Sequence, residues 1–457
     1  MDVINERLTP LGVSKAVNSL GFGFYQLWQL LVLGGVFFIQ AQTFYLFAQS
    51  TRTDNFWSLP AATRAALISV TVGGRSLGFF ASSFFQSRRL PVLFGLIIAT
   101  ASLAGLALAS GQAFNFFLRC AASFGGALGT GPALTLIREL LPGKSAWLAF
   151  TLMSLFWVLG GFSGRFALWF QEDLAMAKSP GHCDLGWLAI SDNTGCSWKT
   201  LAELCVIPAM LFLISACFQL NESPLYFAIT GKHVETNLLL RRVAHANGKR
   251  FTGLRFVPSP VNVPEPGGFS AALSTLSRKE GATTLTISVT LTSLVYWFFL
   301  IRLGQESDSQ IPAAAAAAAI AAGAFTAMPA LLKLRAFSAL ALCCVCWLYF
   351  GRSGPVGAAA ELILLASLTV LKVAGEMEVC DFFPEDERIA GLAMVFGAAS
   401  SVVSFFELAA HLVPLDATEL YLPTAGIFSA VLLTALVVAP RTQPLLSAVE
   451  EKQKLLN

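Results

Sequence analysis

The chain has 457 residues, of which 55% are apolar and 12% are charged. Soluble domains carry roughly twice that share of charged residues, so the composition excludes a soluble fold and indicates a protein of the lipid bilayer. The net charge of +3 comes without a basic stripe carrying interleaved aromatic residues, so we expect no nucleic-acid partner.

Apolar stretches long enough to cross a membrane recur along nearly the whole sequence. A bilayer core of roughly 30 Å is crossed by about 20 helical residues. In chain order we predict twelve such helices, at residues 24–48, 63–86, 90–110, 113–137, 147–170, 201–220, 282–301, 311–332, 335–351, 355–378, 390–412 and 420–439. A signal peptide would begin with basic residues and have a small-residue cleavage site near residue 25, and this sequence has neither feature. We therefore expect the first helix to be retained.

The distribution of Lys and Arg predicts how these helices cross the membrane. With the N-terminus in the cytosol, twenty of the thirty Lys and Arg lie in cytosolic segments, six lie on the opposite side and four lie within helices. Basic residues concentrate on the cytosolic side of membrane proteins. We therefore expect both termini in the cytosol, in the plasma membrane or an organelle membrane. We also expect a monomer.

Two of the nine cysteines, Cys183 and Cys196, share the predicted non-cytosolic loop between the fifth and sixth helices. An oxidising compartment would allow a disulfide there, and two free thiols fit the sequence equally well. Cys343, Cys344 and Cys346 form a group without a neighbouring His or acidic residue. We therefore expect neither a metal site nor a cofactor.

The two halves of the chain carry the same short pattern at matching places. Residues 139–142 and 381–384 each read acid, two apolar residues and proline, and they lie 242 residues apart. The same offset takes Arg119 to Glu361, and basic residues follow both the second and the eighth helix. These matches indicate duplication of a six-helix unit. We predict a six-helix bundle at 1–221, a cytosolic linker with short helices at 222–280, and a second bundle with a cytosolic tail at 281–457.

Six charged residues lie deep in the predicted helices: Arg75, Arg119, Arg165, Glu361, Lys372 and Glu407. A charge in the bilayer is costly unless it faces protein or water. None of the six belongs to the third, ninth or twelfth helix. The pattern resembles the major facilitator transporters, all-α membrane proteins with twelve transmembrane helices in two pseudo-symmetric bundles and a substrate site between them. This resemblance implies that the third, sixth, ninth and twelfth helices face outward.

Residues 219–250 closely resemble the stretch after the sixth helix of the organic ion transporters of the solute carriers and of synaptic-vesicle-type transporters. In that group a Pro-Glu-Ser-Pro box precedes a short helix ending in Asn-Gly; this chain has Asn221-Glu222-Ser223-Pro224 and Asn247-Gly248 there. Ser293-Leu294-Val295-Tyr296 matches the group's seventh helix. The resemblance covers residues 63 to 412. It implies that helices one, four, seven and ten line the substrate cavity.

The chain departs from this group in two loops. The group's loop after helix two reads Gly-x3-Asp-Arg-x-Gly-Arg-Arg, whereas this chain keeps Gly78, Arg88 and Arg89 without the acid. A large glycosylated loop follows helix one in the group, but segment 49–62 is short here. These departures leave open a transport-inactive relative that acts as a sensor or as a subunit of a membrane complex.

Candidate substrate-binding residues are deep or polar side chains of the helices near the expected cavity: Arg75, Arg119, Tyr296, Trp297, Lys372 and Gln29. Gln29 belongs to a polar stripe on the first helix with Gln26, Gln40 and Gln42. The resemblance places Arg119 in the cavity, where it would hold an anion or tune a proton site. Structural alternatives stand beside these roles, because Arg119 can fix helix packing, aromatic residues can face lipid, and Lys372 can neutralise Glu376 one turn away.

Candidate gating residues lie at both ends of the predicted cavity: Arg88, Arg89, Arg138, Glu139, Asp381, Arg388, Glu361 and Glu407. The resemblance implies that Glu139 and Asp381 bind basic loops of the cytosolic gate. On the outer side, we hypothesise that deep cations of the first half approach Glu361 and Glu407 when the gate closes. Pairing of these charges within each half is an equal alternative.

No nucleophile with a base and no metal cluster can be assembled from the four scattered His residues, so we do not expect an enzyme. The sequence predicts a secondary active transporter that moves a small organic ion by alternating access, with a proton or a counter-anion as the coupling ion. Four deep cations against two deep acids favour an anion as the substrate. A neutral-solute porter of the sugar type is the alternative.

Overall fold

The computed structural model describes residues 10–50, 61–108, 112–177, 198–251, 253–254, 268–279 and 372–412, with scattered positions between 282 and 296 and at 366 and 369. Every regular element within these ranges is a helix. Five of the helices contain stretches long and apolar enough to cross a membrane: Phe24–Phe44, Arg89–Leu108, Ala113–Leu140, Ala202–Gln219 and Arg388–Phe405. This agrees with the predicted all-helical membrane fold.

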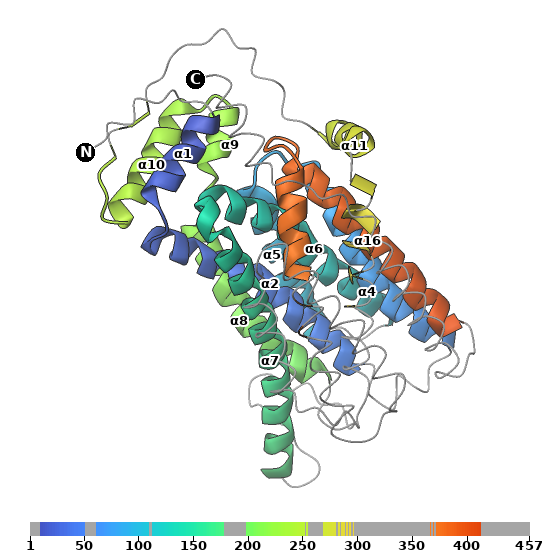
Figure 1. The fold of residues 1–457 in the computed structure, drawn as a ribbon. Helices are drawn as coiled ribbons and strands as arrows, with labels where there is room; N and C mark the ends of the chain where they lie inside the picture. Colours follow the sequence, from blue (N-terminus) through green and yellow to red (C-terminus); the bar gives the residue numbers. More distant parts are fainter. Residues whose placement is uncertain are drawn as a thin grey trace.

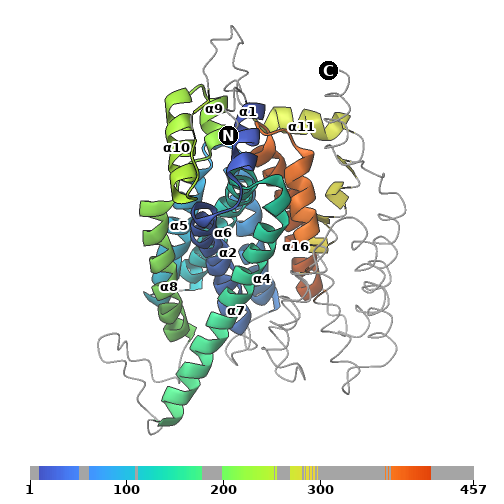
Figure 2. The ribbon, with the colours of Figure 1, turned by 60° about the vertical axis from the view of Figure 1, so that its left-hand side comes forward.

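The long helices of the first half match the first six predicted spans. They are α2 (Phe24–Ser50), α4 (Ala61–Ser82), α5 (Arg89–Leu108), α6 (Gln112–Leu140), α7 (Ala146–Ala177) and α8 (Trp198–Gln219), with the short η1 (Gly143–Ser145) before α7. They run lengthwise through one bundle (Figure 1, Figure 2). Helix α7 continues seven residues beyond its predicted end. The cysteines of the predicted loop, Cys183 and Cys196, lie outside the described residues.

Helices α5 and α8 turn apolar side chains outward. Leu90, Phe94 and Ile97 of α5 are exposed, and so are Leu211 and Phe218 of α8. On helices long enough to span a bilayer, such a surface faces lipid. The third and sixth predicted helices thus face outward, as the resemblance to the major facilitator transporters implies.

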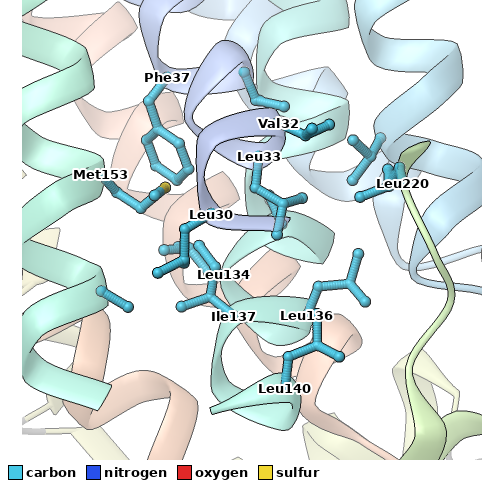
Figure 3. Packing of buried hydrophobic residues seen from close by; sticks show 14 of the residues in the cluster. Leu30, Val32, Leu33, Phe37, Leu134, Leu136, Ile137, Leu140, Met153 and Leu220 are labelled. Carbon is cyan, nitrogen blue, oxygen red and sulfur yellow. The ribbon is translucent and has the colours of Figure 1, made fainter. Parts of the chain in front are cut away.

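The inner faces of α2, α6 and α7 form a buried apolar core. Leu33 and Phe37 of α2 pack in one cluster with Leu134 and Ile137 of α6 and Met153 of α7 (Figure 3). In a bilayer the lipid tails are as apolar as these side chains, so close packing rather than the hydrophobic effect holds such helices together.

Glycines let the helices approach closely enough for that packing. Gly74 and Gly78 of α4 lie against the backbone of α6, at Cys120 and Phe124 respectively. A side chain on either glycine would collide with a carbonyl oxygen of α6. Close approach at small residues is typical of packed membrane helices.

The described part of the second half packs on the first through α4. Helix α16 (Arg388–Leu412), the predicted eleventh span, lies along α4 (Figure 1). The Ser76 hydroxyl donates to the Gly397 carbonyl at 2.9 Å, and the Ser404 hydroxyl donates to the Ser69 carbonyl at 2.9 Å. Helical positions between 282 and 296 and from 372 to 382 belong to the predicted seventh and tenth helices.

Shorter helices gather at one end of the bundle, in the segments predicted to be cytosolic (Figure 1). They are α1 (Pro10–Leu20), α9 (Pro224–Ile229), α10 (His233–Ala246) and α11 (Phe269–Arg278). The Ser223 hydroxyl accepts hydrogen bonds from the backbone N–H groups of Leu225 and Tyr226, so the Glu-Ser-Pro box caps α9. Gly248, at φ +66°, follows α10 in the left-handed region that favours glycine.

Two neighbouring glycines of α7 provide a test of close helix packing. A methyl group on Gly160 would collide with the Phe38 carbonyl of α2, whereas nothing lies within 4 Å of the same position on Gly161. We expect Gly160→Ala to lower the free energy of unfolding by about 2 kcal/mol, because the helices must separate. Gly161→Ala should leave it unchanged or raise it by up to about 1 kcal/mol. Thermal unfolding of the purified proteins in detergent measures both, and equal effects would contradict the packing.

Candidate functional site

A small cavity lies between the two halves and brings together residues far apart in sequence. Its volume of about 20 Å³ is enough for a water molecule. Helices α4 and α6 supply one wall, and the seventh, tenth and eleventh predicted helices supply the other. The lining residues are Arg75, Phe79, Thr130, Leu134, Ser293, Tyr296, Lys372, Glu376 and Phe396.

Three of the lining side chains carry charge. The Lys372 ammonium lies 2.9 Å from the Glu376 carboxylate one helical turn away, and both side chains are largely buried, at 16% and 7% exposed. The ammonium also lies 5.7 Å from the centre of the Tyr296 ring. Arg75 approaches the same cavity from α4, with its guanidinium 5.2 Å from the centre of the Phe79 ring. Two cations and one acid therefore meet in a space screened from lipid.

A second cavity of about 30 Å³ lies within the first half, between α2, α4 and α6. Gln40, Thr43 and Phe44 come from α2, Thr71, Val72 and Arg75 from α4, and Ala122 and Ser123 from α6. Arg75 is the residue that borders both of these cavities. Its guanidinium thus separates a space between the halves from a space inside one of them.

Three predicted substrate-binding residues meet in the first cavity: Arg75, Tyr296 and Lys372. Arg119 lines neither of the two cavities. It is 5% exposed, donates to the Asn115 side chain at 2.7 Å on its own helix, and lies 5.0 Å from the centre of the Phe47 ring. Its geometry is that of the packing alternative. Trp297 lies outside the described residues.

Gln29 also lines neither cavity. Its amide nitrogen donates to the Gln219 carbonyl at 3.0 Å, and its amide oxygen accepts from the Asn221 N–H at 3.1 Å. Both ends of the Gln29 side chain therefore bond to the backbone that follows α8, and Gln29 joins α2 to that segment. Within the predicted polar stripe, Gln40 is the residue that reaches a cavity described here.

Sequence analysis did not single out Thr130 and Thr43, although each lines one of the cavities. Threonine is common in membrane helices because its hydroxyl can bond to its own helix, and Thr130 does donate to the Gly126 carbonyl at 2.7 Å. Residue type alone therefore did not distinguish them. In the sequence, Thr130 stands one helical turn after Gly126, and Thr43 stands one turn after Gln40. These neighbours were the signal that could have found them.

Ion pairs join the halves at the end of the bundle that carries α1, α9, α10 and α11. The Arg138 guanidinium of α6 lies 2.6 Å from the Asp381 carboxylate of the second half. The side chain of Glu139 is fully buried. Its carboxylate lies 3.2 Å from the Arg88 guanidinium and 3.7 Å from the Arg388 guanidinium. These contacts bring together five of the predicted gating residues.

The loop after α4 is completed by an acid from another segment. Glu222 of the Glu-Ser-Pro box accepts hydrogen bonds from the Ser87 hydroxyl at 2.5 Å, the Arg88 N–H at 3.1 Å and the Arg89 N–H at 3.3 Å. The Arg88 guanidinium also donates to the Glu385 carbonyl of the second half at 3.0 Å. Glu222 thus holds the loop that lacks its own acid.

Burial also affects a carboxyl group at this end of the molecule. It raises the pKa of Glu385 above its ordinary value, an effect that the nearby Arg388 partly opposes.

The predicted outer gate falls outside what the structure describes. Glu361 lies among residues that are not described, and the side chains of Glu407 and Arg165 are likewise outside the described part. Their approach across the two halves stays a prediction.

The sequence profile of the sugar (and other) transporter family matches residues 16–250, more than half of the chain. The chain therefore belongs to this family of major facilitator transporters, which are multi-pass integral membrane proteins. No curated protein sequence matches the chain.

Solved structures of major facilitator proteins share the fold. A proton:xylose symporter, XylE, bound to 6-bromo-6-deoxy-D-glucose aligns with a TM-score of 0.65 at 17% identity, over 91% of this chain and 96% of its own. Inward open XylE from E. coli gives 0.59 at 16% identity, over 92% and 97%. FucP in the outward conformation gives 0.53 at 16% identity, over 90% and 96%. The predicted twelve-helix, two-bundle fold is confirmed, and identities this low carry nothing about the substrate.

The pair formed by Lys372 and Glu376 provides a test of the site's electrostatics. Removing one partner leaves the other buried without its counter-charge, so Lys372→Met and Glu376→Gln should each lower the free energy of unfolding by about 3 kcal/mol. The double variant should lose much less than the sum, because both charges are gone. Thermal unfolding in detergent measures all three, and additive losses would show that the pair contributes no coupling.

Proposed function

We propose that this chain is a secondary active transporter that carries a small organic anion between its two halves by alternating access. The observation that supports this most directly is the charged cavity, to which Arg75 comes from the first half and Lys372 and Glu376 come from the second. Charges in a membrane are costly, and they are found where ions or substrates pass. A cavity bordered by both halves is the space that changes when the halves rock against each other.

The charge balance of the lining residues favours an anion. Arg75 and Lys372 each carry a positive charge and Glu376 carries a negative one, so the described lining has a net charge of +1. An anionic group between the halves would balance it. A carboxylate can accept two parallel hydrogen bonds from a guanidinium, which makes Arg75 the preferred first contact.

A neutral, sugar-like solute is the second candidate. The family profile names sugar transporters, and xylose symporters share the fold. The cavity also presents the hydroxyl groups of Thr130, Ser293 and Tyr296, which suit a hydroxylated solute. The two candidates differ in their dependence on Arg75, since a neutral solute requires no counter-charge.

The cytosolic ion pairs support a gate made of the predicted residues. Arg138 and Asp381 belong to different halves, so their contact must break when the cytosolic side opens. Arg88 and Arg388 converge on Glu139 in the same region. We assign these residues to holding the cytosolic side closed, with both termini in the cytosol and a proton or a counter-anion as the coupling ion.

The transport-inactive alternative rested on the loop that lacks an acid. Because Glu222 accepts three hydrogen bonds from this loop, the loop is held in place without its own carboxylate. These three bonds support a working gate.

Uptake by proteoliposomes tests the proposed function. With a panel of labelled organic acids and neutral sugars, we expect uptake of an acid, and Arg75→Gln should reduce it by about 10- to 100-fold, since a hydrogen bond to a charge is lost. Arg75→Lys should retain part of it, and Arg278→Gln, at an exposed cation of α11, should retain all of it. Uptake of a neutral sugar at a rate that Arg75→Gln does not change would instead support the second candidate. Arg119→Ala in the same assay tests the role that the resemblance implies.

Labelling of the cavity tests the cytosolic gate. In a cysteine-free background carrying Thr130→Cys, an impermeant maleimide is added to the cytosolic face of inside-out vesicles. Arg138→Gln or Asp381→Asn should raise the labelling rate roughly two- to fivefold, because the ion pair is partly exposed and contributes modestly. Glu387→Gln is the control and should not change the labelling rate, because it removes the charge of a carboxylate that accepts a hydrogen bond from Thr275 of α11. Unchanged rates in the first two variants would contradict the gate.

A further inference from the structure

The cavity within the first half carries polar groups that the proposed anion site does not use. Gln40 and Thr43 line it beside Arg75. Both side chains are buried, with Gln40 7% and Thr43 3% exposed. The Gln40 Nε2 and the Thr43 Oγ1 have no hydrogen-bond partner among the described residues. Buried polar atoms are nearly always hydrogen-bonded, so two of them on one cavity indicate a bound group that completes them.

Gln40 is held between the two cavities. Its Oε1 lies 3.4 Å from the Thr130 hydroxyl, which itself borders the cavity between the halves. This contact leaves the other end of the Gln40 amide for the inner cavity. Since Arg75 borders both spaces, a ligand whose charged group lies at Arg75 has this amide and the Thr43 hydroxyl within its surroundings.

The chemistry of the two groups selects the partner. A hydroxyl both donates and accepts a hydrogen bond, so it can satisfy the amide of Gln40 and the hydroxyl of Thr43 together. It does so whichever way the amide is turned. Phe44, Val72 and Ala122 supply apolar walls for the carbon that carries the hydroxyl. The volume of about 30 Å³ exceeds what one water molecule needs.

We propose that the inner cavity is a hydroxyl-binding subsite and that the substrates are hydroxylated organic anions, with the anionic group at Arg75 and a hydroxyl between Gln40 and Thr43. This rests on the anion transport proposed above and deepens it. An acid that lacks the hydroxyl leaves two buried polar atoms without partners, so it binds more weakly than its hydroxylated counterpart.

Three pairs of acids that differ by one hydroxyl test the subsite. Lactate is compared with propionate, 3-hydroxybutyrate with butyrate, and malate with succinate, as labelled substrates for uptake into proteoliposomes. We expect the wild-type protein to prefer the hydroxylated member of at least one pair by roughly fivefold. Thr43→Val and Gln40→Leu should reduce that preference to near one. Because the preference is a ratio measured on the same protein, a lower folded fraction in a variant does not affect it.

Thr100→Val is the matched control. Thr100 is also a buried threonine whose hydroxyl has no partner among the described residues, but it lies on α5 and lines neither cavity. Its substitution should leave the preference at its wild-type value. Equal uptake of both members in every pair would overturn the subsite and leave anion transport in place, with the inner cavity holding water only. A preference that survives Thr43→Val and Gln40→Leu would overturn it as well. Uptake of none of the six acids would overturn the anion proposal and the subsite together.

Discussion

The architecture depends on keeping charged side chains away from lipid. Arg75, Lys372 and Glu376 would each be costly against hydrocarbon, and the fold places all three at a cavity between its two halves. The helices that face outward, α5 and α8, expose apolar side chains instead. Because the charges come from both halves, the seam between them is electrostatically distinct from either half alone. A site of this kind forms only when the two bundles meet.

The same constraint acts differently at the end predicted to be cytosolic, where side chains reach water. There the ion pairs can be partly exposed, as Arg138 and Asp381 are, and such pairs are weak enough to open and close. The buried carboxylate of Glu139 supplies the firmer centre, with Arg88 and Arg388 around it. The contact between the halves therefore combines a partly exposed ion pair with a buried carboxylate that Arg88 approaches from the first half and Arg388 from the second.

Much of the fold followed from apolar periodicity and charge, because a bilayer imposes both length and polarity on every helix. The first six spans and α16 lie where the sequence predicts them, and Arg75 and Lys372 share a cavity as expected. The sequence could not show that Gln29 bonds to the backbone near Asn221, or that Glu222 replaces a missing acid. Those contacts join segments more than one hundred residues apart, and no local pattern encodes them.

The short helices α10 and α11, which are predicted to be cytosolic, are attached to different halves of the protein. Asn247, at the end of α10, accepts from the Tyr25 N–H at 3.1 Å and donates to Gln26 at 2.8 Å, which fastens α10 to the first transmembrane helix. On the other side, Thr275 of α11 donates to Glu387 at 2.6 Å, which fastens α11 to the second lobe. The segment predicted as one linker is therefore anchored to both halves. Under the proposed alternating access, α10 and α11 would move with opposite halves, so the distance between them would report the direction in which the central cavity opens.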